Sequence, residues 1–517
     1  MKRRFLALSM GMLLIASVSI AQDDQVIADI IKEANENSQL ENLAHELMDV
    51  VGPRLVGTPQ MKNANDWAVN KYAGWDISAE NEQWGEWRGW ERGITHVDMV
   101  SPRIVSLNAM QLAWSPNGPK KGIKNADVVG FPTFANKQAY TDWLGTIKGK
   151  VVMVSMPQPT GRPDYNWDKF GTEESIAKIK KDRNELSTAW NKNISVSGFN
   201  SRTIVAEIEK AGAAAIFSSR WSRGFGANKI FSAGTESIPN IDISLEDYAM
   251  LYRMFQHGNS AKVNVVSESK ELGNVPVFNT IATIQGSEKP NEYVMLSAHF
   301  DSWDGGTGAT DNGTGSILMM EVMRILKKHY PNPKRTIIVG HWGSEEQGLN
   351  GSRAFVEDHP EIVDNIQVLF NQDNGTGRAV NLSGQGFLNS YEYLGRWMAK
   401  VPRKISSQIE TNFPGTPGGG GSDYASFVAA GAPAFSLSSL SWDYGTYTWH
   451  TNLDTYDKIV FDDVRSNVVL AAILTYMASE DPETTSRERS VLPLSRRTGD
   501  QMTWPTQRSP NRKGGQN

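Results

Sequence analysis

The stretch SAHFDSWDGGTGATDNGTGS, residues 297–316, combines many glycines with one histidine and three aspartates. A glycine-rich loop that binds phosphate offers backbone amides and usually a cation, but this stretch contains no lysine or arginine. Imidazole and carboxylate groups are instead ligands for divalent metal ions. The stretch therefore predicts a metal site that draws on His299, Asp301, Asp304 and Asp311.

Three later segments carry side chains of the same two types: GSEEQG with Glu345 and Glu346, NQDNG with Asp373, and YTWHTN with His450. Each follows a predicted strand, and functional loops leave the carboxyl ends of parallel strands at one edge of a sheet. Five ligands without sulfur suit two zinc ions that share a bridging carboxylate. We predict that the ligands are His299, Asp311, Glu346, Asp373 and His450.

The position of each ligand predicts its role. Asp311 lies in a flexible loop at the start of a helix, so it can reach the middle of the site and bridge both metals. His299 with Asp373 would complete one metal site, and Glu346 with His450 the other.

Glu345 and Glu346 are adjacent, so their carboxylates point in different directions and only one of them binds metal. Zinc lowers the pKa of water toward neutrality, and we predict that Glu345 is the general base that takes its proton and passes it to the leaving amine. Asp301 is predicted to accept a hydrogen bond from the ring nitrogen of His299 that does not bind metal. His341, inside the strand before the glutamate pair, is predicted to be structural.

Taken singly, these residues have simpler explanations. A glutamate pair is usually a solvated helix face, and a histidine after a strand usually packs against its neighbours. Other catalytic motifs fail: GGTGATD places Asp311 where a dinucleotide fingerprint needs glycine, HELMD at His45 lacks a second histidine, and Gly-x-Ser-x-Gly is absent. The metal site therefore depends on all the predicted ligands meeting at matching strand ends.

The composition limits the class of protein. The chain has 517 residues, a net charge of -5 and a pI of about 6.0, which offers no basic face for nucleic acid. It has no cysteine, which excludes disulfides and thiolate catalysis. Residues 1–21 resemble a signal peptide, and without disulfides an exported enzyme suits the periplasm or exterior of a bacterial envelope. An uncleaved anchor is less favoured because the apolar run is shorter than the ~20 residues that span a bilayer.

The chain divides into regions that differ in their patterns of apolar and polar residues. Alternating strands and helices predict an α/β/α sandwich around a mixed, mostly parallel sheet over residues 22–124 and 275–481. Residues 125–270 predict a small inserted domain, and residues 482–517 a flexible basic tail. Three tryptophans at spacing three predict a packed core edge, with a ligand platform as the alternative: Trp84, Trp87 and Trp90. The predicted strands are 293–298, 336–340, 366–371 and 434–437, with a last helix at 462–479.

These stretches resemble the co-catalytic di-zinc exopeptidases, with GGGGSDYASFVAAGAPA, WHTNLDTYDKI and VVGPRLVGTPQMKNANDWAV as further points of similarity. The resemblance covers most of residues 40–480 and implies a zinc-peptidase fold with a protease-associated domain inserted before the first metal ligand. It implies the metal and base roles assigned above, and a short peptide or dipeptide cleaved at one end. Related enzymes often carry a tyrosine before the last histidine, where this chain has Trp449; Tyr444 or Tyr447 could substitute.

Two other functions compete with peptide hydrolysis. A receptor-like binding protein on the same fold would be expected to lose ligands or the base, whereas this chain keeps all six residues. A zinc glutaminyl cyclase needs no hydrolytic water, and such relatives usually bind one zinc. The glycine-rich stretch PGTPGGGGSDYASF is predicted to border the substrate pocket or to be a plain linker. The recognised peptide terminus and the oligomeric state, a homodimer included, stay open.

Overall fold

The computed structural model describes residues 24–495 and 497–515. The predicted signal peptide, residues 1–21, lies outside this part of the chain. Within the described residues, no helix combines the length and the apolar character needed to cross a bilayer.

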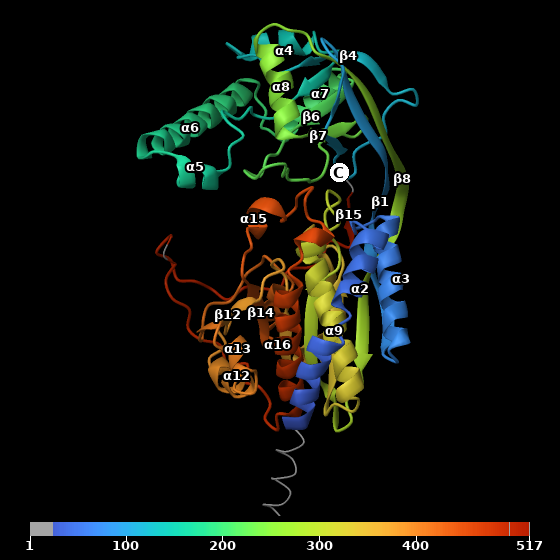
Figure 1. Cartoon of the computed structure of the whole chain (residues 1–517), viewed down its shortest axis with the longest axis vertical. Coiled ribbons are helices and arrows are strands. Elements are labelled where there is room, and N and C mark those ends of the chain that lie inside the picture. Colours follow the sequence, from blue (N-terminus) through green and yellow to red (C-terminus); the bar gives the residue numbers. More distant parts are fainter. Residues whose placement is uncertain (1–23, 496, 516–517) are drawn as a thin grey trace, which may run out of the picture.

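The chain forms two lobes, one above the other in Figure 1. The lower lobe holds the largest hydrophobic core, which includes Leu296 in the sheet, Leu318 below the predicted site and Ile473 near the end of the chain. The upper lobe has two cores of its own, around Val263 and Ile208. The lower lobe is an α/β fold with a mixed, mostly parallel central sheet and flanking helices.

The strands of the lower lobe carry the predicted site. β9, β10, β11 and β14 run parallel to one another, whereas β8 pairs with β10 and β12 pairs with β14 in the antiparallel sense. The four strands predicted from sequence are confirmed, with boundaries that differ by a few residues at most. The strands of this part are β8 (Lys262–Ile284), β9 (Lys289–His299), β10 (Arg335–Trp342), β11 (Ile366–Asn371), β12 (Ala379–Ser383), β13 (Glu410–Asn412) and β14 (Ala434–Ser439).

Helices cover the sheet and place the loops that follow the strands. Residues 24–36 are helical and precede the labelled elements. α9 packs against α16 and against the sheet, and the shorter α10 packs against α14. The helices of the lower lobe are α2 (Leu40–Ala44), η1 (His45–Val51), α3 (Pro59–Gly74), η2 (Ala309–Gly313), α9 (Thr314–His329), α10 (Asn350–Asp358), α11 (Pro360–Asp364), α12 (Ser390–Met398), α13 (Arg403–Ser406), α14 (Tyr424–Ala430), α15 (Tyr444–Tyr447), η3 (Tyr456–Lys458) and α16 (Phe461–Glu480).

The upper lobe is a small parallel sheet with helices. β4, β5, β6 and β7 are parallel in that order, and β3 closes the edge in the antiparallel sense. Its core also takes in Val97, Met99 and Leu107, which precede the predicted boundary at residue 125. Its elements are β2 (Val105–Leu107), β3 (Ala109–Gln111), β4 (Ile123–Val129), α4 (Lys137–Leu144), β5 (Val151–Met153), α5 (Asp164–Phe170), α6 (Glu173–Val196), α7 (Thr203–Lys210), β6 (Ala215–Ser218), β7 (Asn240–Ile243) and α8 (Leu245–Gln256).

A long two-stranded ribbon joins the lobes (Figure 1). β1 (Ser78–Ser101) has 24 residues and β8 has 23, and they pair in the antiparallel sense along most of their length. β8 also pairs with β10 at its lower end and with β4 at its upper end. Trp84, Trp87 and Trp90 lie on β1 and are buried in a separate apolar cluster, so the prediction of a packed core edge is confirmed.

The described residues of the C-terminal segment, which is predicted to be a flexible tail, make several contacts with the lower lobe. The ring of Trp504 packs edge-on against Phe387 at 5.6 Å between centroids. Arg512 donates to Asp358 at 2.7 and 3.0 Å, and β15 (Lys513–Gly514) pairs with β1. These contacts are widely spaced along the segment, so they leave no periodic apolar pattern in the sequence.

Candidate metal centre

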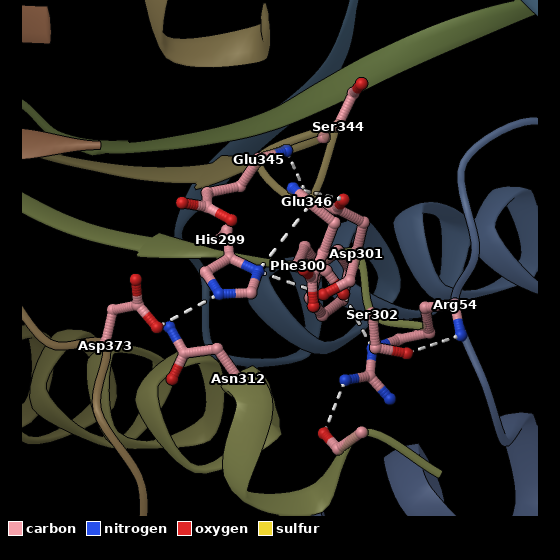
Figure 2. A network of polar contacts seen from close by, with 12 residues as sticks. Arg54, His299, Phe300, Asp301, Ser302, Asn312, Ser344, Glu345, Glu346 and Asp373 are labelled. Carbon is pink, nitrogen blue, oxygen red and sulfur yellow. Dashed lines mark hydrogen bonds and ion pairs between the residues drawn. The ribbon is translucent and has the colours of Figure 1, made fainter. Parts of the chain in front are cut away.

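The five predicted ligands meet above the carboxyl ends of the parallel strands. β9 ends at His299, β10 leads into the loop that carries Glu346, and β11 leads into the turn that carries Asp373. Asp311 lies in η2, and His450 follows α15. Figure 2 shows His299 beside Asp373, with the loop of the glutamate pair next to them.

The side chains form two trios that share one carboxylate. His299 Nε2 lies 3.1 Å from Asp373 Oδ1 and 3.4 Å from Asp311 Oδ1. His450 Nε2 lies 2.8 Å from Glu346 Oε2 and 3.2 Å from Asp311 Oδ2. In each trio one ligand atom per residue lies within 4.8 Å of the others, close enough to hold one metal ion. Asp311 belongs to both trios.

The charges of the site favour a bound cation. Burial raises the pKa of Glu345 well above its usual value, His299 opposes this, and the neighbouring acids, among them Asp373, add to the increase. Glu346 Oε1 is buried without a hydrogen-bond donor among the described residues. Buried carboxylates are costly unless a cation or a donor compensates them. The imidazole and carboxylate donors therefore fit a pair of divalent ions such as zinc.

Asp301 accepts the predicted hydrogen bond from His299 through its backbone carbonyl, and its carboxylate acts on the glutamate pair. The ring Nδ1 of His299 lies 3.0 Å from the backbone carbonyl oxygen of Asp301 and 3.7 Å from its carboxylate. The carboxylate instead accepts hydrogen bonds from the backbone amides of Glu345 and Glu346, at 3.0 and 3.2 Å. Asp301 therefore orients the loop after β10, and its carbonyl orients the histidine. The spacing of two residues could not distinguish these atoms.

Asp454 positions the bridging residue, and sequence reasoning did not single it out. Its carboxylate accepts hydrogen bonds from the backbone amides of Thr310 and Asp311, at 2.8 and 3.0 Å. Burial, together with the charge of Asp311, raises the pKa of Asp454 to about 7. Its position four residues after His450 was the available signal.

Arg54 holds the loop between His299 and Asp311 from below. The side chain is fully buried and donates to the backbone carbonyls of Phe300, Thr307 and Gly308 at 2.7–2.8 Å, and to Gly52 at 3.1 Å. Figure 2 shows the guanidinium reaching this loop. A buried arginine whose N–H groups all donate to backbone carbonyls holds those backbone segments in place, so Arg54 sets the path of the ligand-bearing loop. Arg54 lies in the stretch VVGPRLVGTPQMKNANDWAV, which resembles the family, but the sequence alone assigns no role to its side chain.

Of the two tyrosines considered as substitutes at Trp449, Tyr444 lies nearer the site. Burial and then the charges of Asp311 and Asp373 raise the pKa of the Tyr444 phenol well above its usual value. Tyr447 instead packs on Gly224 of the upper lobe. Trp449 itself stacks on the ring of His450 at 4.0 Å between centroids.

The upper lobe reaches into the site. The backbone amide of Ile230 donates to the carbonyl of His450 at 2.8 Å, and the ring of Phe231 packs edge-on against the imidazole at 5.3 Å between centroids. Lys229 Nζ donates to the carbonyls of Gly445 and Trp449 at 2.8 and 2.6 Å. The backbone of the last predicted ligand therefore rests on residues from the other lobe.

A large cavity opens beside these contacts. It has a volume of about 1470 Å³ and is lined by upper-lobe residues together with Trp303. Phe231 and Trp303 both line it and both contact the ring of His450. None of the five predicted ligands lines the cavity, which lies next to the metal centre through the contacts of these two rings with His450.

Comparison with known proteins agrees with this geometry. Residues 279–474 match the sequence model of peptidase family M28. The chain is 27% identical to carboxypeptidase Q of Bos taurus over 448 residues, which cover 86% of each chain. It is 26% identical to carboxypeptidase Q of Homo sapiens over 450 residues, 87% of this chain and 86% of the human one. The matched family segment spans every predicted ligand and the predicted base.

Residues 279–474 of the chain belong to peptidase family M28. The chain is a metallo-exopeptidase, a hydrolase of peptide bonds.

Solved structures share the fold of this M28 peptidase. The peptidase M28 precursor from Shewanella amazonensis has a TM-score of 0.62 at 24% identity, covering 90% of this chain and 98% of that one. A zinc aminopeptidase from Bacillus subtilis has a TM-score of 0.52 at 19% identity, covering 87% and 96%. These similarities extend over both lobes of the M28 peptidase.

Proposed function

We propose that this chain is an exported di-zinc exopeptidase that removes residues from one end of short peptides. The observation that carries the proposal is the pair of trios that share Asp311, since a shared carboxylate between two donor sets is the arrangement that two co-catalytic ions require. His299 and Asp373 would complete one zinc site, and Glu346 and His450 the other. The zinc in the description of the Bacillus subtilis relative supports the choice of metal.

The catalytic roles follow from which side chains remain free of the metals. A bound zinc pair would lower the pKa of a water molecule and polarise the scissile carbonyl. Glu345 is not part of either trio and lies half-buried beside His299, so its carboxylate would take the proton from the attacking water and return it to the leaving amine nitrogen. Asp301 would hold Glu345 in place through its backbone amide. Tyr444 is the candidate donor to the developing oxyanion.

The substrate and the location are argued from the relatives and the sequence. The name carboxypeptidase Q supports cleavage at the carboxyl terminus, whereas the named aminopeptidase shares only the fold. The upper lobe is proposed to be an inserted protease-associated domain that encloses the substrate, since it has cores of its own and contacts the last ligand. Export rests on the predicted signal peptide, and a homodimer is the proposed assembly.

The test combines a metal count with a base variant. Elemental analysis of the purified protein should find two zinc ions per chain, and removing them with a chelator should abolish hydrolysis of a dipeptide panel. Glu345→Gln should keep both metals and the native fold but lower kcat by about a hundredfold or more. The exposed Glu361→Gln, on α11, is the matched control and should behave as wild type.

Three outcomes would contradict the proposal. A single zinc together with release of cyclised N-terminal glutamine would indicate the cyclase. Metal binding and peptide binding without turnover would indicate the receptor-like protein. Unchanged turnover in Glu345→Gln would remove this residue from the mechanism.

A further inference from the structure

Asp304 is the aspartate of the stretch 297–316 that takes no part in the metal trios or in holding the glutamate-pair loop. Its side chain is buried, with 6% of its surface exposed. A buried carboxylate needs a cation or hydrogen-bond donors to compensate its charge. The partner of Asp304 is Arg92, which lies on β1 in the ribbon that joins the lobes.

The guanidinium of Arg92 connects three segments of the chain. Its Nε donates to Asp304 Oδ2 at 2.9 Å, and Nη2 donates to the backbone carbonyl of Asp304 at 2.8 Å. Its Nη1 donates to the backbone carbonyl of Gln111, in β3 of the upper lobe, at 2.7 Å. The planar fork of an arginine holds several acceptors in one geometry, which a point charge does not do. Arg92 therefore connects the ligand-bearing loop both to the ribbon and to the upper sheet.

An irregularity in the ribbon accompanies this contact. The register of β1 against β8 shifts between Arg92 and Thr95. A shift of this kind bends a strand locally and redirects its side chains. Arg88, on the same strand, instead pairs with the exposed Glu271 of β8 and so forms its ion pair within the ribbon. The two arginines share a strand but hold different parts of the molecule.

Trp303, the residue before Asp304, carries the contact toward the metal centre. Its ring packs edge-on against Phe231 at 5.2 Å between centroids, and against Trp114 at 6.1 Å. The same ring lies 6.0 Å from the imidazole of the predicted ligand His450. Because Trp303 and Asp304 are adjacent, the bonds that hold Asp304 also limit where this ring can lie. The ring in turn limits where the imidazole can lie.

We propose that Arg92 and Asp304 are positioning residues that hold the upper lobe against the ligand-bearing loop. Through Trp303 they keep His450 in place for its metal. The catalytic consequence rests on the proposed di-zinc function, whereas the contact between the lobes does not. The other predicted site is built on His299, whose ring Nδ1 lies 3.0 Å from a backbone carbonyl of its own loop. The metal site that contains His450 should therefore depend on Arg92 more strongly than the other site does.

Hydrogen exchange of the purified protein tests the contact without hydrolysis. The backbone amides of Ile230 and Asn452 donate to carbonyls of the opposite lobe at 2.8 and 3.1 Å. Asp304→Asn should speed the exchange of these two amides about tenfold or more, while exchange in β11 stays within about twofold of wild type. Arg88→Gln is the matched control and should leave the two amides unchanged. Unchanged exchange in Asp304→Asn, or equal acceleration in β11, would overturn the proposal.

Zinc affinity and kinetics test the effect on the metal centre. In Asp304→Asn one of the two zinc ions should bind about 10- to 100-fold less tightly in a chelator competition, while the affinity for the other stays within about twofold. The value of kcat should fall about tenfold with KM within about twofold. Arg92→Lys keeps the charge but loses the fork, so its kcat should lie between those of wild type and Arg92→Gln. An equal loss of both zinc ions would overturn the selective effect on His450.

A double-mutant cycle shows whether the two residues act as one unit. Arg92→Gln combined with Asp304→Asn should lower kcat no further than the larger of the two single effects, whereas multiplying effects would mean that the residues act independently and would overturn the pair. If wild type binds a single zinc ion or cleaves no dipeptide, the proposed function is refuted. The exchange of the inter-lobe amides in the same variants then decides this proposal by itself.

Discussion

Glu33 offers a quantitative test of how the N-terminal helix is attached to the catalytic lobe. Its carboxylate lies 2.7 Å from Arg324 Nη1 and 2.8 Å from Lys328 Nζ, both on α9, and its side chain is only 4% exposed. Burial alone would raise the pKa of Glu33, but the hydrogen bonds and charges of Lys328 and Arg324 overcome this and lower it from 4.5 to about 2. The ionised form is therefore the one that the fold stabilises.

The size of the effect follows from the linkage between protonation and folding. The difference between the two pKa values, at about 1.4 kcal/mol per pH unit, gives about 3 kcal/mol. Because the folded-state pKa is lowered, this contribution is present in full above pH 4.5 and is lost as the pH falls toward 2. Glu33→Gln removes the charge at every pH. Its deficit in the free energy of unfolding should therefore be about 3 kcal/mol at pH 7 and shrink toward zero near the lower value.

The assay is urea unfolding followed by far-ultraviolet circular dichroism, repeated between pH 7 and pH 2.5 on wild type and Glu33→Gln. The exposed Glu36→Gln, in the same helix, is the control for changes in helix propensity. A deficit of the same size at all pH values would refute the linkage, because it would mean that shape and packing rather than charge hold the helix.

Two further substitutions test the residues that position the metal centre. Asp454→Asn keeps the shape of the side chain but loses one strong acceptor for the two backbone amides, so zinc affinity measured by chelator competition should fall about 10- to 100-fold. The exposed Asp457→Asn is the control and should leave zinc affinity unchanged. Equal affinities in wild type and Asp454→Asn would show that other contacts hold the ligand loop. Lys229→Met removes the two hydrogen bonds to the loop that includes Trp449, so kcat/KM should fall about tenfold with an unaltered circular dichroism spectrum. The exposed Lys210→Met on the same lobe is the control and should have no effect on kcat/KM. A fall in kcat/KM in both variants would mean that the upper lobe as a whole, and not this contact, is affected.

The parallel strands and their ends were readable from sequence because their signal is local. Apolar runs such as 366–371 end at polar or glycine-rich turns, and the carboxyl ends of parallel strands must lie at one edge. The convergence of His299, Asp311 and His450 followed from that topology alone. It did not need any knowledge of the contacts between them.

The supporting contacts could not be read in the same way. Whether Asp301 uses its carbonyl or its carboxylate depends on backbone dihedral angles that spacing does not fix. Asp454 and Arg54 act on backbone groups far away in the sequence, and such partners leave no periodic pattern. The contacts of the C-terminal segment leave a similarly weak signal, because Trp504 and Arg512 are isolated contact residues in a polar stretch.

The continuous β8 strand limits how the two lobes can move. One strand is hydrogen-bonded into the catalytic sheet at one end and into the upper sheet at the other, and β1 follows it along most of that length. A continuous two-stranded ribbon of this kind can bend, but it does not allow the free rotation of the lobes that a flexible linker would allow. Any change in the distance between the two lobes would therefore require this ribbon to bend, at a cost set by the hydrogen-bonded pairing of β1 and β8.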